Sequence, residues 1–150
     1  MKKILLILVL VVLVCTDLTA QVEYKVITSV ESIVPAGLGR SRIISAEEER
    51  DYKEFTSEQT EDDNSRNKSK RSDIRVKDFE ETKLLNFFNL GGIRFQNIAA
   101  NDAVITSKIN NMINEGWELA FVTSAVESDS GKDDGNGIFI TRYIFKRSKQ

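Results

Sequence analysis

The last third of the sequence, from 101 to 147, contains a helix pattern that ends at a glycine and continues into two strand patterns. Apolar residues recur at helical spacing before Gly116, at Val104, Ile105, Ile109, Met112 and Ile113. Gly116 stands where a helix commonly ends in a left-handed residue, which costs least as glycine. Residues 117–123 alternate as a strand does, and residues 138–146 are rich in β-branched and aromatic side chains. This order of elements predicts an α+β fold.

A further strand is predicted near the beginning of the chain, over 23–30, before Pro35 interrupts the pattern. We expect the last strand to lie between this strand and the one that starts at Trp117, which gives a small split β-α-β-β sheet with the helix packed on one face. Asn101 or Asp102 is expected to cap the helix. The expected core comprises Val26 or Ile27, Ile109, Trp117, Leu119, Phe121, and Tyr143 or Ile144.

Residues 1–20 have the pattern of a secretory signal peptide. Lys2 and Lys3 precede an apolar run from 4 to 14, which is shorter than a membrane-spanning helix requires. We expect cleavage after Ala20, which leaves 21–150 as a single secreted or periplasmic domain without a membrane span. A lipid anchor on Cys15 is disfavoured because Val14, rather than a small residue, precedes the cysteine.

The middle of the chain combines a charged stretch with an apolar one. Residues 45–73 are acidic first and basic later, and Tyr52 and Phe55 are their only large apolar side chains, so we expect a disordered insertion. A short helix from Ser45 through Phe55 is the alternative for the first part. An acidic interaction tail is the functional alternative to a disordered insertion. Residues 84–98 suit a hairpin that turns at Gly91-Gly92, and a short helix ending at Gly91 is the alternative there.

Three short motifs resemble the bacterial "domain of unknown function 4177" family. They are Tyr24-Lys25-Val26, the turn Asn114-Glu115-Gly116-Trp117-Glu118-Leu119, and the closing Tyr143-Ile144-Phe145-Lys146-Arg147. The resemblance implies a strand, a helix and two further strands, and covers less than half of the chain. It implies no activity and brings no catalytic residues. The signal segment and the insertion from 31 to 100 depart from the family's pattern, which suggests a secreted branch.

The expected topology directs most irregular backbone to one end of the sheet, and we place a ligand or partner site there. Glu31 and Glu127 occupy similar positions after their strands, within Thr28–Ser32 and Thr123–Ser128. The helix start would add free N–H groups that favour an anion. The candidate binding residues are Glu31, Arg40, Arg42, Arg94, Asn101 and Glu127. A purely structural interpretation is that these charges pair with one another and order the insertion.

The composition argues against the commonest kinds of enzyme. The chain has no histidine, and its only cysteine is Cys15, so we assign no catalytic residue, metal site or cofactor. The patterns at Gly37-Leu-Gly39, at Ser65 to Lys68 and at Asp129 to Asn136 do not complete a nucleotide, β-lactamase or calcium motif. A formal net charge of −2 gives no reason to expect nucleic acid. We therefore predict a non-enzymatic binding or interaction module of the cell envelope, with an envelope protein or a small polar ligand as partner. The alternative is a hydrolase of an exported polymer that uses the carboxylates of Glu31 and Glu127.

Overall fold

Two eleven-residue strands, β1 (Val22–Ser32) and β7 (Ile138–Ser148), form the centre of a five-stranded sheet. The computed structural model describes residues 21–32, 41–89, 91–126 and 137–149. β1 and β7 pair antiparallel along their whole length, from Val22 opposite Ser148 to Ser32 opposite Ile138. β6 (Glu118–Val126) lies on the other side of β7, so the last strand stands between the first strand and β6, as predicted.

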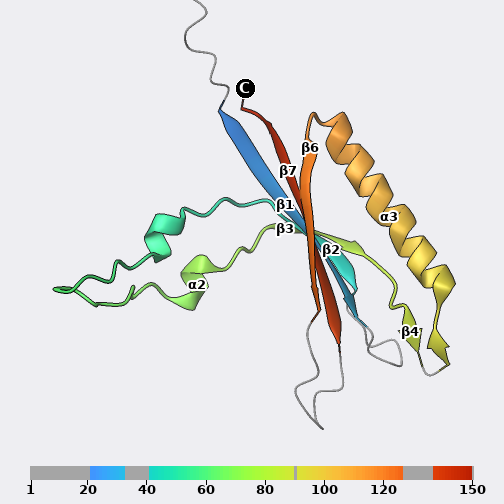
Figure 1. Ribbon diagram of the computed structural model, residues 1–150, viewed down its shortest axis with the longest axis horizontal. Coiled ribbons are helices and arrows are strands. Elements are labelled where there is room, and N and C mark those ends of the chain that lie inside the picture. Colours follow the sequence, from blue (N-terminus) through green and yellow to red (C-terminus); the bar gives the residue numbers. More distant parts are fainter. Residues whose placement is uncertain (1–20, 33–40, 90, 127–136, 150) are drawn as a thin grey trace, which may run out of the picture.

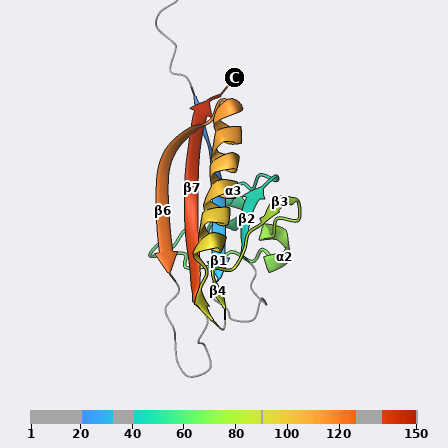
Figure 2. The ribbon, with the colours of Figure 1, turned by 90° about the vertical axis from the view of Figure 1, so that its right-hand side faces the viewer.

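Two strands that the sequence did not clearly predict extend the sheet beyond β1. β2 (Arg42–Ala46) pairs with β1, and β3 (Phe79–Lys83) pairs with β2, which gives the order β3-β2-β1-β7-β6. Each neighbouring pair is antiparallel. The long helix α3 (Phe95–Asn114) covers one face of this sheet (Figures 1 and 2). The α+β class and the helix on one face are therefore confirmed.

The helix starts earlier than the sequence suggested. α3 begins at Phe95, with Arg94 at its N-cap, so Asn101 is the seventh helical residue and caps nothing. The side chain of Asn101 is 1% exposed and binds neighbouring segments, which explains how a typical capping residue is accommodated inside a helix. The predicted placement of Asn101 at a ligand-binding helix start is wrong.

The helix ends where the sequence predicted, through two hydrogen bonds that close a Schellman motif. The N–H of Trp117 donates to the carbonyl of Met112 at 3.0 Å, and the N–H of Gly116 donates to that of Ile113 at 2.9 Å. Met112 and Trp117 both belong to the buried core, which supplies the apolar contact that accompanies this motif. Gly116 has φ +85°, a conformation that other L-residues adopt at a cost.

Replacing Gly116 by alanine should lower the free energy of unfolding by about 1 kcal/mol, because a Cβ disfavours the left-handed conformation. Nothing lies within 4 Å of the added Cβ, so the loss would be conformational rather than steric. Urea unfolding followed by circular dichroism measures it. Asn114→Ala, two residues earlier at an exposed helical position, is the control and should be close to neutral. Equal midpoints for the two variants would show that the glycine is dispensable.

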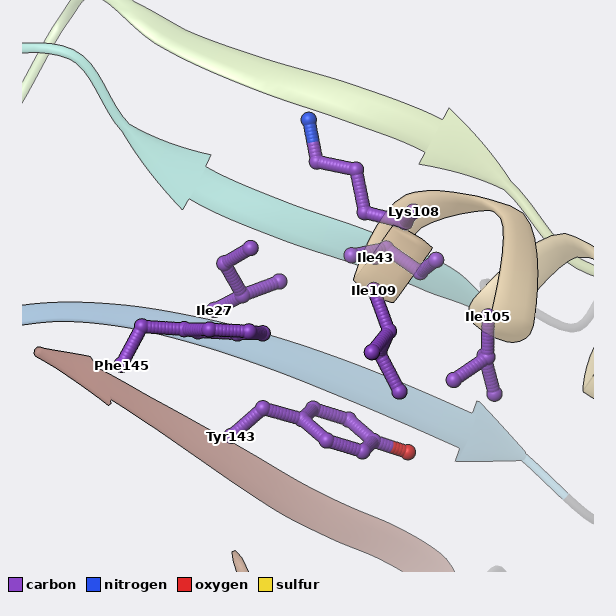
Figure 3. Close-up of a pocket in the computed structure, with 7 residues that line it drawn as sticks. All are labelled: Ile27, Ile43, Ile105, Lys108, Ile109, Tyr143 and Phe145. Carbon is purple, nitrogen blue, oxygen red and sulfur yellow. The ribbon is translucent and has the colours of Figure 1, made fainter. Parts of the chain in front are cut away.

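The core lies between α3 and the sheet, and a β-bulge decides which side chains of β6 reach it. Ile27, Met112, Trp117 and Phe145 are buried, together with Ile43 and Leu84 from segments that the sequence left outside the core. Figure 3 shows Ile105 and Ile109 of α3 directed toward Ile27, Ile43, Tyr143 and Phe145 of the sheet.

The predicted burial of Phe121 is wrong. Leu119 lies opposite Phe145, whereas Phe121 lies opposite Ile144, so Ala120 is an extra residue in β6. The bulge reverses the alternation along the strand and turns Phe121 to the face away from α3, where it is 61% exposed.

Residues 47–78, which we call the arm, leave the sheet between β2 and β3. The arm contains a 3₁₀ turn, η2 (Tyr52–Phe55), and one turn of helix, α2 (Arg71–Ile74). It projects from the side of the sheet opposite α3 (Figure 1). The predicted insertion boundary at 45 and the helix from Ser45 are wrong, because Ser45 pairs with Ile27 in the sheet. Disorder over the remainder of 45–73 stays a prediction.

The segment between β3 and α3 carries a much shorter strand pair than the predicted hairpin over 84–98. β4 (Phe88–Asn89) pairs with β5 (Gly92–Ile93), two residues on each side. Residues 84–87 lie in neither helix nor strand. The second strand of the predicted hairpin is wrong from Phe95 onward, where α3 begins.

Candidate functional site

The first five residues of β1 have a strand neighbour on one side only. β7 pairs with all of β1, but β2 pairs with it only from Ile27 to Val30. Along Val22–Val26 no strand lies on the β2 side, within the part of the chain that the structure describes. An unpaired strand edge presents backbone N–H and C=O groups that can bind another extended segment.

A groove of about 360 Å³ lies at this open edge. One wall is formed by β1, and the other by the chain that leaves β2 and enters the arm. Trp117 and Arg147 also line it. The lining residues are Glu23, Tyr24, Lys25, Val26, Ala46, Glu47, Glu48, Glu49, Trp117 and Arg147.

Ion pairs hold the charged side chains of the groove in place. Arg147 bonds to the carboxylate of Glu23 on the neighbouring strand, and its guanidinium lies over the ring of Trp117, 4.1 Å from the centroid. Lys25 lies 3.5 Å from Glu47 and so links β1 to the base of the arm. These contacts give the groove defined walls, and four glutamates against two basic side chains give it a formal excess of negative charge.

Glu48 fixes the arm's base beside the groove. Its carboxylate accepts hydrogen bonds from the backbone N–H groups of Asp78, at 2.9 Å, and Lys77, at 3.2 Å, and it pairs with Arg50. The N–H of Asp78 and the Arg50 side chain lower the pKa of the Glu48 carboxyl from its ordinary value. Both limbs of the arm are thereby joined where they leave the sheet.

The four sequence-predicted site residues that the structure describes, Glu31, Arg42, Arg94 and Asn101, do not form one surface. Glu31 and Asn101 do meet, since the amide of Asn101 donates to Glu31 at 3.0 Å, but Asn101 is buried and also binds the backbone of Leu85. Arg42 pairs with Glu81 at 2.5 Å on the face of the sheet away from α3, so it lies on the opposite side from Glu31. Arg94 is exposed at the start of α3. Arg40 and Glu127 lie outside the described residues.

Sequence reasoning missed the groove because its walls come from residues that no motif connects. The alternation of Glu23, Tyr24, Lys25 and Val26 predicted a strand, but the length over which β2 pairs with it is a property of the sheet. Trp117 was predicted to be core, which is correct at 8% exposure, and the stacked Arg147 adds the polar side that faces the groove. Two charges alternating within an apolar strand were the available signal.

The small cavity under α3 offers no site. Apart from Lys108 and the hydroxyl of Tyr143, its lining side chains are apolar (Figure 3). The ammonium of Lys108 is bound to Glu80 at 2.6 Å. Among the described residues no three acidic, histidine or cysteine side chains are grouped as metal ligands would be. In the same part of the chain, none of the helices combines the length and apolar character needed to cross a bilayer.

Comparison of the chain with protein families, with curated proteins and with solved structures found no match.

Proposed function

We propose that the protein is a non-enzymatic binding module that takes up an extended, basic peptide segment at the open edge of β1. The observation that carries this proposal is the half-paired strand with a defined groove beside it. Export to the cell envelope, with cleavage after Ala20, belongs to the proposal and rests on the sequence pattern of residues 1–20. The kinship with the domain of unknown function 4177 family likewise stays a prediction.

Strand addition explains why an open edge would be useful. A bound peptide would accept and donate backbone hydrogen bonds along Val22–Val26, and its alternate side chains would enter the groove. Main-chain bonds supply affinity in this mode, whereas the groove supplies specificity. Lys25 and Glu23 point to the side that α3 covers, and Tyr24 and Val26 point to the other side, so side chains on both faces of an added peptide strand would be contacted.

The charges favour a basic partner. Glu47 and Glu49 are exposed at the wall of the groove, and the lining carries more acidic than basic side chains. Complementary charge raises the rate of association and disfavours acidic competitors. The described residues give the hydrolase alternative no support, since the carboxylate of Glu31 is bound to the buried Asn101. Its second carboxylate, Glu127, lies outside the described residues.

The proposal predicts that a synthetic peptide in which lysine alternates with valine will bind, and that Glu47→Lys combined with Glu49→Lys will weaken binding about tenfold. Fluorescence anisotropy with the labelled peptide measures the affinity. Hydrogen exchange reports the mode, since alternate amides within Val22–Val26 should become protected when the peptide adds as a strand.

The matched control is Glu58→Lys with Glu61→Lys, which makes the same change of charge in the same acidic limb of the arm but outside the groove. This control should bind the peptide nearly as the unchanged protein does. If both double variants weakened peptide binding equally, the effect would come from the overall charge of the protein and not from the groove. Binding without protection of Val22–Val26 would show that the peptide does not add to β1.

A further inference from the structure

The face of the sheet away from α3 is unusually apolar. Strand register places on it Tyr24, Val26, Ile44, Phe121, Ile140 and Ile144, which we call the open face. Tyr24 is 65% exposed, Phe121 61% and Val26 44%. A sheet with one solvated face normally carries polar residues there, and a contiguous exposed apolar surface marks an interaction site.

Arg142 stands in the middle of the open face. On the same side of the sheet lie Arg42, which pairs with Glu81, and Lys146, which pairs with Glu118. Arg142 of β7 lies opposite Thr28 on one side and Thr123 on the other, and Ile140 and Ile144 flank it along the strand. Arg142 is exposed. A cation within an apolar surface suits an occupant that combines carboxylates with aromatic or aliphatic side chains.

The arm of the same chain has this combination. Residues 47–63 contain nine acidic residues against two basic ones, Arg50 and Lys53. Tyr52, in η2, is 71% exposed, and Ile74, in α2, is 51% exposed, so the arm's apolar side chains are not buried within their own chain. The arm extends away from the sheet on the side of the open face (Figure 1), where it can reach a second molecule that faces it.

We infer that two copies of the chain form a symmetric dimer in which the arm of each lies on the open face of the other. Tyr52 packs on the exposed apolar side chains, and carboxylates of the arm's acidic limb lie around Arg142. A two-fold axis makes the contact self-complementary, because the same pair of surfaces is used twice.

The area available is sufficient for such a dimer. At strand spacings of about 4.8 Å and a rise of about 3.3 Å per residue, the sheet presents roughly 650 Å² on one face. If this whole face of the sheet were buried in both copies, roughly 1,300 Å² would be removed from solvent, within the range of specific interfaces. A second copy is the occupant that the charges favour, since the acidic limb and the face around Arg142 are opposite in sign and belong to one chain.

Sedimentation velocity of the full chain tests this inference. We expect a dimer. Phe121→Lys and Arg142→Glu should each raise its dissociation constant about tenfold or more, because the first places a charge on the apolar surface and the second reverses the charge at its centre. Tyr52→Ala should weaken it independently from the arm. The matched control is Phe95→Lys, which makes the same change at a phenylalanine that is 75% exposed at the start of α3. This variant should remain dimeric, and circular dichroism should show all four variants folded.

Crosslinking identifies which surfaces meet. A photoreactive benzoylphenylalanine introduced at Tyr52, in a mixture of ¹⁵N-labelled and unlabelled chains, should link to β1, β6 or β7 of the other copy. A monomeric full chain would overturn the inference, as would a dimer that Phe121→Lys leaves intact. A dimer whose Tyr52 position links only within its own chain, or to α3, would overturn it as well.

Discussion

Phe145→Ala should cost about 3–5 kcal/mol of unfolding free energy, the largest loss expected for a single substitution in this protein. Phe145 is the most buried of the large side chains, at 0% exposure, and it lies in the central ladder, opposite Lys25 on one side and Leu119 on the other. Removing its ring leaves a cavity between the sheet and α3 that neighbouring side chains can fill only in part. Denaturant unfolding, with the slope held common to all variants, measures the loss.

Phe95→Ala is the control for this prediction, because it removes the same side chain from a site that is 75% exposed. It should change the free energy of unfolding by less than about 1 kcal/mol, since surface substitutions away from specific contacts have small effects. Similar losses at the two positions would mean that α3 does not pack on the central strands as described.

Asn101→Ala should destabilise the protein by about 2–3 kcal/mol, because it removes the three hydrogen bonds that this one buried side chain makes. The Asn101 carbonyl oxygen accepts from the N–H of Leu85 at 2.8 Å, and its amide donates to the carbonyl of Leu85 at 2.7 Å and to Glu31 at 3.0 Å. This side chain thus joins α3 to β1 and to the segment after β3. Asn110→Ala, at an exposed position of the same helix, should change stability by less than about 0.5 kcal/mol.

Asn101→Asp adds a test of the contact with Glu31. The new carboxyl would be buried beside a second carboxylate, so its pKa should be raised in the folded state above its value in the unfolded chain. The native state then binds more protons, and stability falls as pH rises from the unfolded pKa through the folded one. We expect the variant to be less stable than the unchanged protein at pH 7 and to recover part of the difference near pH 4. If the free energies of unfolding of the two proteins changed with pH in parallel, the contact between residue 101 and Glu31 would be contradicted.

α3 and the central strands of the fold were largely predictable because local chemistry sets them. Gly116 adopts the left-handed conformation that ends α3, and Met112 and Trp117 both lie in the core, as the Schellman motif favours. β1 and β7 follow from alternation and β-branched residues, and their pairing in the centre follows from connection rules. These features depend on residues close in sequence or on general rules of topology.

The strands β2 and β3 and the true start of α3 were harder to predict from the sequence. β2 and β3 are five residues each and enclose the arm, so their partners lie far away in sequence and the pairing depends on β1 being in place. The helix continues back to Phe95 because Asn101, a residue with low helix propensity, finds partners in Leu85 and Glu31. Tertiary hydrogen bonds of this kind override local preference.

The sequence by itself determined the α+β class, the glycine-ended helix and the order of the central strands, because backbone conformation and hydrophobic period are local properties. Only the tertiary structure decided which surfaces are free to bind. The bulge at Ala120 moved Phe121 from the expected core to the open face, and the short reach of β2 left Val22–Val26 with one strand neighbour. Both outcomes depend on register between strands, which is set by the packing of the whole sheet and cannot be read from any one strand.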